Sequence, residues 1–460
     1  MFQNINIKLS ELPWSATDPI FPHHSVILKY IEEYYKIYNL DKHLLFNTKV
    51  IKAEKVEQEN KQFPKWNIHY LNLTTNNKKC EMFDFLIIAS GLNTNAIYPN
   101  MPQLKNFRGD IMHSIDYKEP RKYKNKNVLV IGGAFSGTEI SCEVSLSANK
   151  VINHVRNPLW VVPRFQFCDN FEKILPHDIQ YSRGEKSKLD MFDKFSLDRL
   201  KTQADVVHSY LNYKTNNNDN IKELTVKSGN YGLTFSDNYL NYVKKGYIEV
   251  KNGEITDIKH EGKDGKVDMV YFSDGSSYNV DSIILCTGLK INVYEYLEEE
   301  VLKTINFDKD DHFMPMILYK AVFHPAIKSL GFIGQFKAMN WREFELEARY
   351  ITMLFSKLIN YPDDSLAYKH LKNEENLRKW GNELGLQWPY ANLSFPFSLA
   401  NEIGCLPNYD KIKTEDPELY DILCNYPIVN NIFRIEGKFN QKEKAIGYLR
   451  HFKQLIKPKF

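Results

Sequence analysis

A short glycine-rich segment carries the clearest potential for chemistry in this sequence. It consists of Gly132, Gly133, Ala134, Phe135, Ser136 and Gly137, directly after the apolar run NVLVI. Where such a turn joins a strand to a helix, its backbone N–H groups and the helix dipole favour a bound diphosphate. Gly132 permits the tight turn, and Gly137 lets the helix lie close to the strand. The segment therefore predicts a dinucleotide site. At position 134 the motif prefers Gly, and the methyl group of Ala134 narrows the space in which the backbone approaches the diphosphate.

The end of the next expected strand indicates which dinucleotide binds. A helix over about 136–148 and a strand over 151–155 complete a βαβ unit that ends at Arg156. NAD sites usually carry Asp or Glu there, which accepts a hydrogen bond from the ribose 2′-hydroxyl. An Arg can instead hold a 2′-phosphate through two hydrogen bonds. We expect NADP(H) over NAD(H), with Arg156 as the 2′-phosphate ligand; the alternative is a solvated surface Arg.

The His113–Ser114 pair and the cysteines are two further candidates for reactive groups, but their spacing does not support a catalytic or metal site. His113 precedes Ser114, but adjacent side chains point in different directions and no acid is placed to orient the histidine. A hydrolase is therefore disfavoured. The six cysteines include no C-x-x-C pair, so neither a zinc ribbon nor a redox-active dithiol is expected, and no metal site is predicted.

Three short apolar runs, at 85–89, 127–131 and 282–286, are the elements that would position these residues. Small residues follow each run, and the first is followed by Ser90 and Gly91. Runs that are apolar on both faces are typical of central parallel strands. Ligands of open α/β sheets lie at the carboxyl ends of such strands. The sequence thus predicts a mixed α/β fold with parallel sheets.

Helices and one hairpin are expected around these strands. Apolar stripes at helical spacing occur in 27–38, 344–358 and 445–455, and Asp274-Gly275 predicts a hairpin turn. The 460 residues, 43% hydrophobic and 25% charged, have the balance of a globular protein with two or three domains. A net charge of +3 gives no reason to expect nucleic acid or a membrane surface as partner. No apolar run approaches the ~18 residues of a transmembrane helix.

A second motif resembles a known family. Phe107, Gly109, His113, Ser114 and Tyr117 fit F-x-G-x-x-x-H-S-x-x-Y, which identifies the flavin-containing monooxygenases. Similarity continues through the helix at 23–50, ILCTGLK at 284–290 and ANEIGCLPN at 400–408, and omits about 165–240. The resemblance implies a two-dinucleotide-binding-domain architecture. In it, an NADPH domain over 121–290 is inserted in an FAD domain formed by 1–120 and by 291–460, the latter ending in helices.

The resemblance also implies cofactors and chemistry. In the family, NADPH reduces FAD, the reduced flavin captures O2 as a C4a-hydroperoxide, and a tertiary amine nitrogen or sulfide sulfur takes the distal oxygen. Val50 is implied as a backbone contact to the FAD adenine, with Ser90 and Gly91 at the first strand exit and Gln335 facing the flavin. No catalytic side chain is assigned, because the flavin carries the oxygen chemistry.

Other implied positions have two interpretations each. The motif from Phe107 to Tyr117 either braces the linker between the domains or contacts a ligand. Trp341 and Phe336 either line a substrate pocket or belong to core or surface. The substrate and the oligomeric state are not predicted.

The beginning of the chain departs from the family. Members open with a strand, a G-x-G-x-x-G turn and an acid for the FAD ribose, whereas residues 1–11 resemble the stretch that follows this unit. Phe2 and Ile5 fit that stretch, but Lys8 replaces an Asn close to the flavin and Ser10 replaces a Pro. We therefore expect an FAD domain that is incomplete at its N-terminus. A truncated sequence is favoured over a degenerate relative that holds FAD poorly.

The favoured function is thus an NADPH- and FAD-dependent monooxygenase of soft nucleophiles. One alternative is a different NADPH flavoenzyme of the same two-domain plan. Another is a catalytically silent NADPH-binding relative that has lost its flavin. A cytoplasmic location is expected, because the hydrophobic C-terminal anchor of some relatives is lacking.

Overall fold

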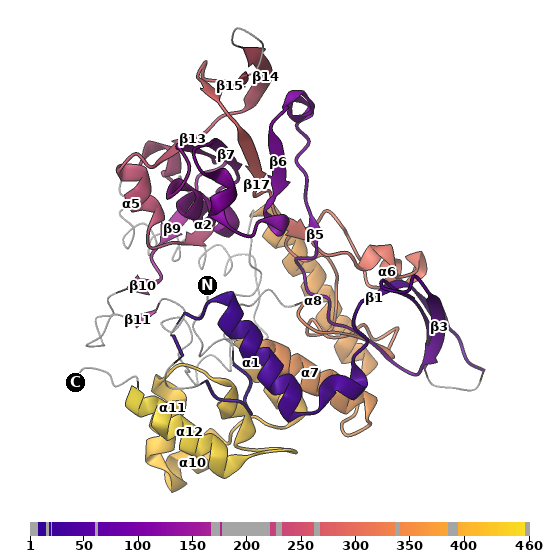
Figure 1. Ribbon diagram of the computed structural model, residues 1–460. Coiled ribbons are helices and arrows are strands. Elements are labelled where there is room, and N and C mark those ends of the chain that lie inside the picture. Colours follow the sequence, from indigo (N-terminus) through magenta and orange to yellow (C-terminus); the bar gives the residue numbers. More distant parts are fainter. Residues whose placement is uncertain are drawn as a thin grey trace.

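The computed structural model describes residues 8–14, 18–19, 21–59, 63–166, 175–176, 221–226, 232–261, 267–335, 341–384 and 394–455. A five-stranded sheet forms the upper part of the molecule (Figure 1). Its strand order is β13 (Ile248–Lys251), β8 (Lys150–His154), β7 (Asn127–Ile131), β17 (Ser282–Leu285) and β6 (Asp110–His113). All neighbouring strands are parallel. The predicted central strands at 127–131 and 282–286 are therefore confirmed.

Both faces of this sheet are covered, as the apolar strands require. On one face α2 (Phe135–Ser145) and α5 (Tyr239–Lys244) pack over a core that includes Val128 and Val130. On the other, a core that includes Leu129 and Ile131 packs against an antiparallel sheet. That sheet consists of β14 (Ile255–Glu261), β15 (Val267–Phe272) and β16 (Ser277–Asn279). Asp274 and Gly275 form the hairpin turn between β15 and β16, as predicted.

A second group of small sheets lies beside the first. An antiparallel meander comprises β1 (Thr48–Val56), β2 (Lys65–Asn72) and β3 (Lys78–Phe83). The predicted strand at 85–89 is β4 (Leu86–Ile88), which pairs in parallel with β19 (Leu330–Phe332). The connections between the halves run side by side as β5 (Asn95–Ala96) and β18 (Leu289–Lys290). Short pairs also join β9 (Trp160–Val162) to β12 (Leu233–Phe235), and β10 (Phe165–Gln166) to β11 (Leu175–Pro176).

Most helices lie in the lower part of the molecule, whereas α6 (Glu299–Thr304) lies beside β1 (Figure 1). The helices of the lower part are α1 (His24–Ile37), α7 (Trp341–Phe355), α8 (Asp364–Glu383), α9 (Ser394–Ile403), α10 (Tyr409–Glu415), α11 (Pro417–Asn425) and α12 (Lys442–Leu455). The largest hydrophobic core lies among α7 to α12. No helix in these described ranges is both long and apolar enough to cross a bilayer.

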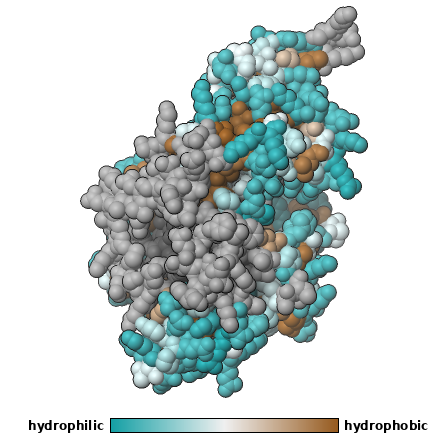
Figure 2. Space-filling view, turned by 90° about the vertical axis from the view of Figure 1, so that its left-hand side faces the viewer, coloured by the Kyte–Doolittle hydropathy of each residue, from teal (hydrophilic) through white to brown (hydrophobic). Residues whose placement is uncertain are grey.

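The helical stripes have different outcomes. The stripe in 445–455 is confirmed, because Ala445, Leu449 and Phe452 are buried in the core. The stripe in 27–38 forms α1 and is only partly core-facing: Tyr30 is 4% exposed, whereas Ile31 is 47% and Tyr38 41% exposed. Among the residues that are coloured in Figure 2, hydrophilic ones predominate, and the larger hydrophobic patches lie in the upper half of the view.

Candidate functional site

The glycine-rich turn between β7 and α2 is held by backbone contacts. Gly132 has a φ of +124°, which L side chains rarely adopt, and a Cβ there would lie 2.2 Å from the Cys286 carbonyl oxygen. A Cβ on Gly137 would lie 1.9 Å from the Gly132 carbonyl oxygen. Gly133 faces the side chains of Val155 and Leu159 at less than 3 Å from an added Cβ. The packing at this turn therefore requires glycine at 132 and 137, where the added Cβ would meet backbone, whereas at 133 it would meet only side-chain methyl groups.

The N-terminus of α2 is suited to an anion. Ala134 is the N-cap residue and makes no side-chain capping bond. The first turn begins with Phe135, Ser136 and Gly137 and holds no acidic residue. Since the first N–H groups of a helix have no partner within it, and no side-chain charge competes here, an anion is favoured at this end.

One large cavity joins this turn to the ends of the other strands. Its volume is about 1850 Å³, beyond the roughly 300–1,000 Å³ of common small-ligand sites. Gly132, Gly133, Ala134 and Arg156 line one wall. The same cavity is also lined by residues from distant parts of the sequence, namely Ser90, Gly91, Gly288, Gly334 and Trp341. The space suits two extended ligands rather than one metabolite.

Arg156 and a buried histidine lie at the end of β8 on this cavity. Arg156 is exposed, whereas His154 is buried, and both line the cavity. Burial lowers the pKa of His154, and the positive charge of Arg156 lowers it further, while the Gly253 carbonyl acts in the opposite direction. Arg156 thus adds a positive charge to this wall, and Glu254 adds a carboxylate beside Gly253.

Several sequence-predicted residues lie outside the cavity lining. Phe135, Ser136 and Gly137 are in the first turn of α2, behind the lining part of the loop. Val50 is a half-exposed residue of β1. Gln335 follows Gly334, and its Oε1 is buried with no hydrogen-bond partner among the described residues.

The motif residues from 107 to 117 brace the sheet and do not line the cavity. Phe107 is in the core beneath the sheet, and the N–H of Gly109 donates to Asp268 at 3.0 Å. The Nδ1 of His113 accepts from the N–H of Ile115 at 3.2 Å, so it caps the turn that contains Ser114. The Tyr117 hydroxyl donates to Glu143 on α2 at 3.0 Å. These contacts favour the bracing interpretation.

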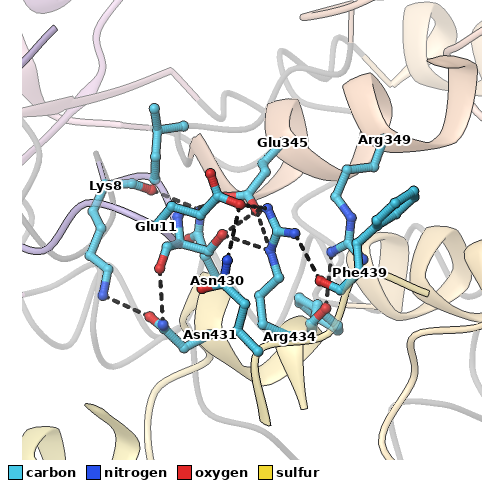
Figure 3. Close-up of polar contacts among 12 residues, drawn as sticks. Lys8, Glu11, Glu345, Arg349, Asn430, Asn431, Arg434 and Phe439 are labelled. Atoms are coloured by element: carbon cyan, nitrogen blue, oxygen red, sulfur yellow. Dashed lines mark hydrogen bonds and ion pairs between the residues drawn. The ribbon is translucent and has the colours of Figure 1, made fainter. Parts of the chain in front are cut away.

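A buried polar cluster that sequence reasoning did not anticipate joins the N-terminal segment to α7 and residues 430–434 (Figure 3). The N–H and hydroxyl of Ser10 donate to Glu345 at 2.9 and 2.6 Å. Arg434 pairs with both Glu345, at 3.0 Å, and Glu11, at 3.2 Å. The Lys8 ammonium donates to Asn431 at 2.7 Å.

This cluster shows what Lys8, which replaces the family's Asn, contacts in this chain. Lys8 does not line the cavity but is buried beside Asn431 and over the Tyr448 ring. Burial holds the pKa of its ammonium well below the usual range. Phe2, Ile5 and Phe336 lie outside the described residues.

Comparison with known protein families identifies the family of this chain. A sequence model described as flavin-binding monooxygenase-like matches residues 6–458. The chain belongs to this family. It is 26% identical over 436 residues to the 4-hydroxybenzoate brominase (decarboxylating) of Marinomonas mediterranea, covering 92% of this chain and 78% of that protein. It is 26% identical over 454 residues to human flavin-containing monooxygenase 5, covering 95% and 78%.

Solved structures share the fold of this family member. The S-allyl-L-cysteine S-oxygenase of Allium sativum superimposes with a TM-score of 0.56 at 19% identity, covering 99% of this chain and 83% of that one. Cyclohexanone monooxygenase from Rhodococcus sp. Phi1 bound to NADP+ gives 0.59 at 13%, covering 84% and 83%. The expected α/β architecture is thereby confirmed. Because the family match begins at residue 6, it lends no support to the expected loss of an N-terminal FAD unit.

Proposed function

We propose that this chain uses NADPH and FAD to oxygenate a small soft nucleophile, a tertiary amine nitrogen or a sulfide sulfur, with O2. The family supplies the class of reaction, flavin-dependent monooxygenation. The single observation that carries the two-cofactor proposal is the cavity, because it is lined by both the 132–134 turn and the strand exits at Ser90 and Gly334. Two dinucleotides placed at these ends would meet inside one space.

NADPH is the ligand proposed for the turn between β7 and α2. Its diphosphate would lie on the N–H groups at the start of α2, where no side chain caps the helix. Gly132 and Gly137 let the start of α2 pack close to the strand ends, since a Cβ at either position would collide with protein backbone. Arg156, exposed on the cavity wall, would hold the 2′-phosphate.

FAD is the ligand proposed for the opposite wall. Ser90 and Gly91 follow β4, and Gly334 and Gln335 follow β19, so four residues from two parallel strands converge at one edge. Gln335 and Val50 lie outside the cavity lining, so their proposed contacts, of Gln335 with the flavin and of Val50 with the adenine, rest on the family resemblance. When bound, the flavin supplies the oxygen chemistry, while the residues of this chain bind, orient and exclude water.

The two alternatives remain testable beside this proposal. Purified chain would be supplied with FAD, and its colour, NADPH consumption, O2 consumption and products would be measured. Oxygenated product that requires both NADPH and O2 supports the monooxygenase. A colourless chain that still binds NADPH supports the silent relative, whereas NADPH oxidation that releases only peroxide does not separate the monooxygenase from another flavoenzyme. Cytoplasmic location stays a prediction, which cell fractionation tests.

A further inference from the structure

His154 is a buried ionisable residue on the cavity wall. It ends β8, two residues before Arg156, and is 6% exposed. Its ring lies edge-on against Phe272 of β15, with 5.8 Å between the ring centroids, and forms part of the cavity lining. The imidazole is therefore fixed by the sheet core on one side and lies next to the proposed 2′-phosphate ligand on the other.

The tautomer of this ring follows from its single hydrogen bond. The Nε2 atom is 2.7 Å from the Gly253 carbonyl oxygen. Because a carbonyl only accepts, Nε2 carries the hydrogen. The Nδ1 atom is buried and has no hydrogen-bond partner among the described residues. A proton added to the neutral ring would go to Nδ1 and would find no acceptor within the described part of the chain, which favours the neutral ring when no ligand is bound.

The charges around the ring reinforce this neutral state. Arg156 contributes a positive charge from the same strand end and lowers the pKa of His154. Lys251, the register partner of His154 on β13, is paired with Asp274 at 2.7 Å. Glu254 follows Gly253 on the cavity lining. An added anion near Arg156 would shift the balance toward a protonated ring, because it would offset the positive charge that lowers the pKa of His154.

We propose that His154 takes up a proton when a 2′-phosphate binds beside Arg156, and that it thereby makes the preference for NADPH over NADH depend on pH. This inference rests on the proposed NADPH site and adds a second specificity-determining residue to it. A dianionic phosphate stabilises an imidazolium through space and, with a small shift of the ring, through an Nδ1–H bond. NADH lacks that phosphate, so its binding leaves the ring neutral. By linkage, NADPH affinity rises as pH falls through the pKa of His154 in the NADPH complex toward its lower pKa in the free protein, and NADH affinity does not.

The test compares dissociation constants of NADPH and NADH at about pH 8 and about pH 6.5, between which the phosphate remains mostly dianionic. For the unaltered chain, we expect the ratio of the NADH constant to the NADPH constant to rise about three- to tenfold as pH falls. His154→Gln keeps a donor for the Gly253 carbonyl but cannot gain a charge, and should lose this rise. A ratio that is constant in the unaltered chain, or that rises equally in His154→Gln, overturns the inference.

Calorimetry in two buffers of different ionisation enthalpy gives a readout that needs no variant. We expect net proton uptake on NADPH binding near pH 7 and none on NADH binding; equal uptake for both contradicts the proposal. The phosphate itself titrates near pH 6 and would release protons on binding, so uptake has the opposite sign. Failure of both nucleotides to bind at either pH would refute the nucleotide site itself, and the role of His154 with it.

Discussion

Replacing Gly137 by Ala perturbs the turn at a point where backbone leaves no room. The added Cβ would lie 1.9 Å from the Gly132 carbonyl oxygen, whereas real Cβ contacts are essentially never below 3.0 Å. The start of α2 and the end of β7 must therefore separate by about 1 Å, and neither partner is a flexible side chain. Overpacking of this kind costs about 1–3 kcal/mol, occasionally more. The same displacement moves the N–H groups that would hold the diphosphate.

Two measurements on Gly137→Ala follow from this. Its midpoint of thermal unfolding should fall, by roughly 2–4 °C for each kcal/mol in a domain of this size. Its NADPH dissociation constant should rise about tenfold or more, which corresponds to about 1.4 kcal/mol of lost binding. Fluorescence titration and thermal denaturation give both values on one preparation.

Gly447→Ala is the matched control. Gly447 lies in α12, and a Cβ there has no atom within 4 Å. The control should unfold at the same or a slightly higher temperature, because Ala favours a helix over Gly by about 0.5–1 kcal/mol, and should bind NADPH unchanged. If Gly137→Ala matched the unaltered chain in both measurements, the assignment of the turn as a close-packed diphosphate site would be refuted.

Three further substitutions probe other parts of the molecule. Arg156→Ala should weaken NADPH about 10- to 150-fold and NADH far less, as a lost charge-assisted bond of ~1.5–3 kcal/mol implies, and equal weakening would exclude Arg156 as the 2′-phosphate ligand. Glu345→Ala should lower the free energy of unfolding in urea by about 1–3 kcal/mol, because Ser10 and Arg434 lose their shared acceptor. Glu345→Gln should lower this free energy less. An unchanged urea midpoint in Glu345→Ala would contradict this prediction. Burial raises the pKa of Glu374 to about 8. The free energy of unfolding of the unaltered chain should therefore decline as pH rises from about 4.5 through about 8, whereas that of Glu374→Gln, which cannot ionise at this position, should decline less in the same urea series. Parallel pH profiles of the two proteins would count against a buried, neutral Glu374.

Local signals were sufficient for the β7–α2–β8 unit. The apolar run at 127–131, the glycines at 132 and 137, and the second apolar run each act within a few residues, and the structure has the strand and helix there. The hairpin at Gly275 is similar, since its φ of +83° is a property of the turn alone. Elements specified by neighbours in sequence can be predicted from sequence.

Burial that depends on distant partners could not be predicted. Periodicity shows that Ile31 and Tyr38 share a face of α1, but not whether another element covers that face, and the described structure leaves both exposed. Glu347 is of a residue type that is usually exposed, yet its side chain is fully buried and accepts a hydrogen bond from the N–H of Gly334 at 2.6 Å. Lys8 is buried because of Asn431, more than 400 positions away. No local pattern carries such information.

The two-cofactor cavity is tested most directly by mixing the chain with FAD, removing oxygen and adding NADPH while the flavin absorbance is followed. We expect the oxidised flavin band to bleach in the unaltered chain and in Gly447→Ala, and to bleach only at much higher NADPH concentrations in Gly137→Ala. A flavin that stays oxidised in the unaltered chain, with both nucleotides shown to be bound, would contradict the placement of the two sites on one cavity.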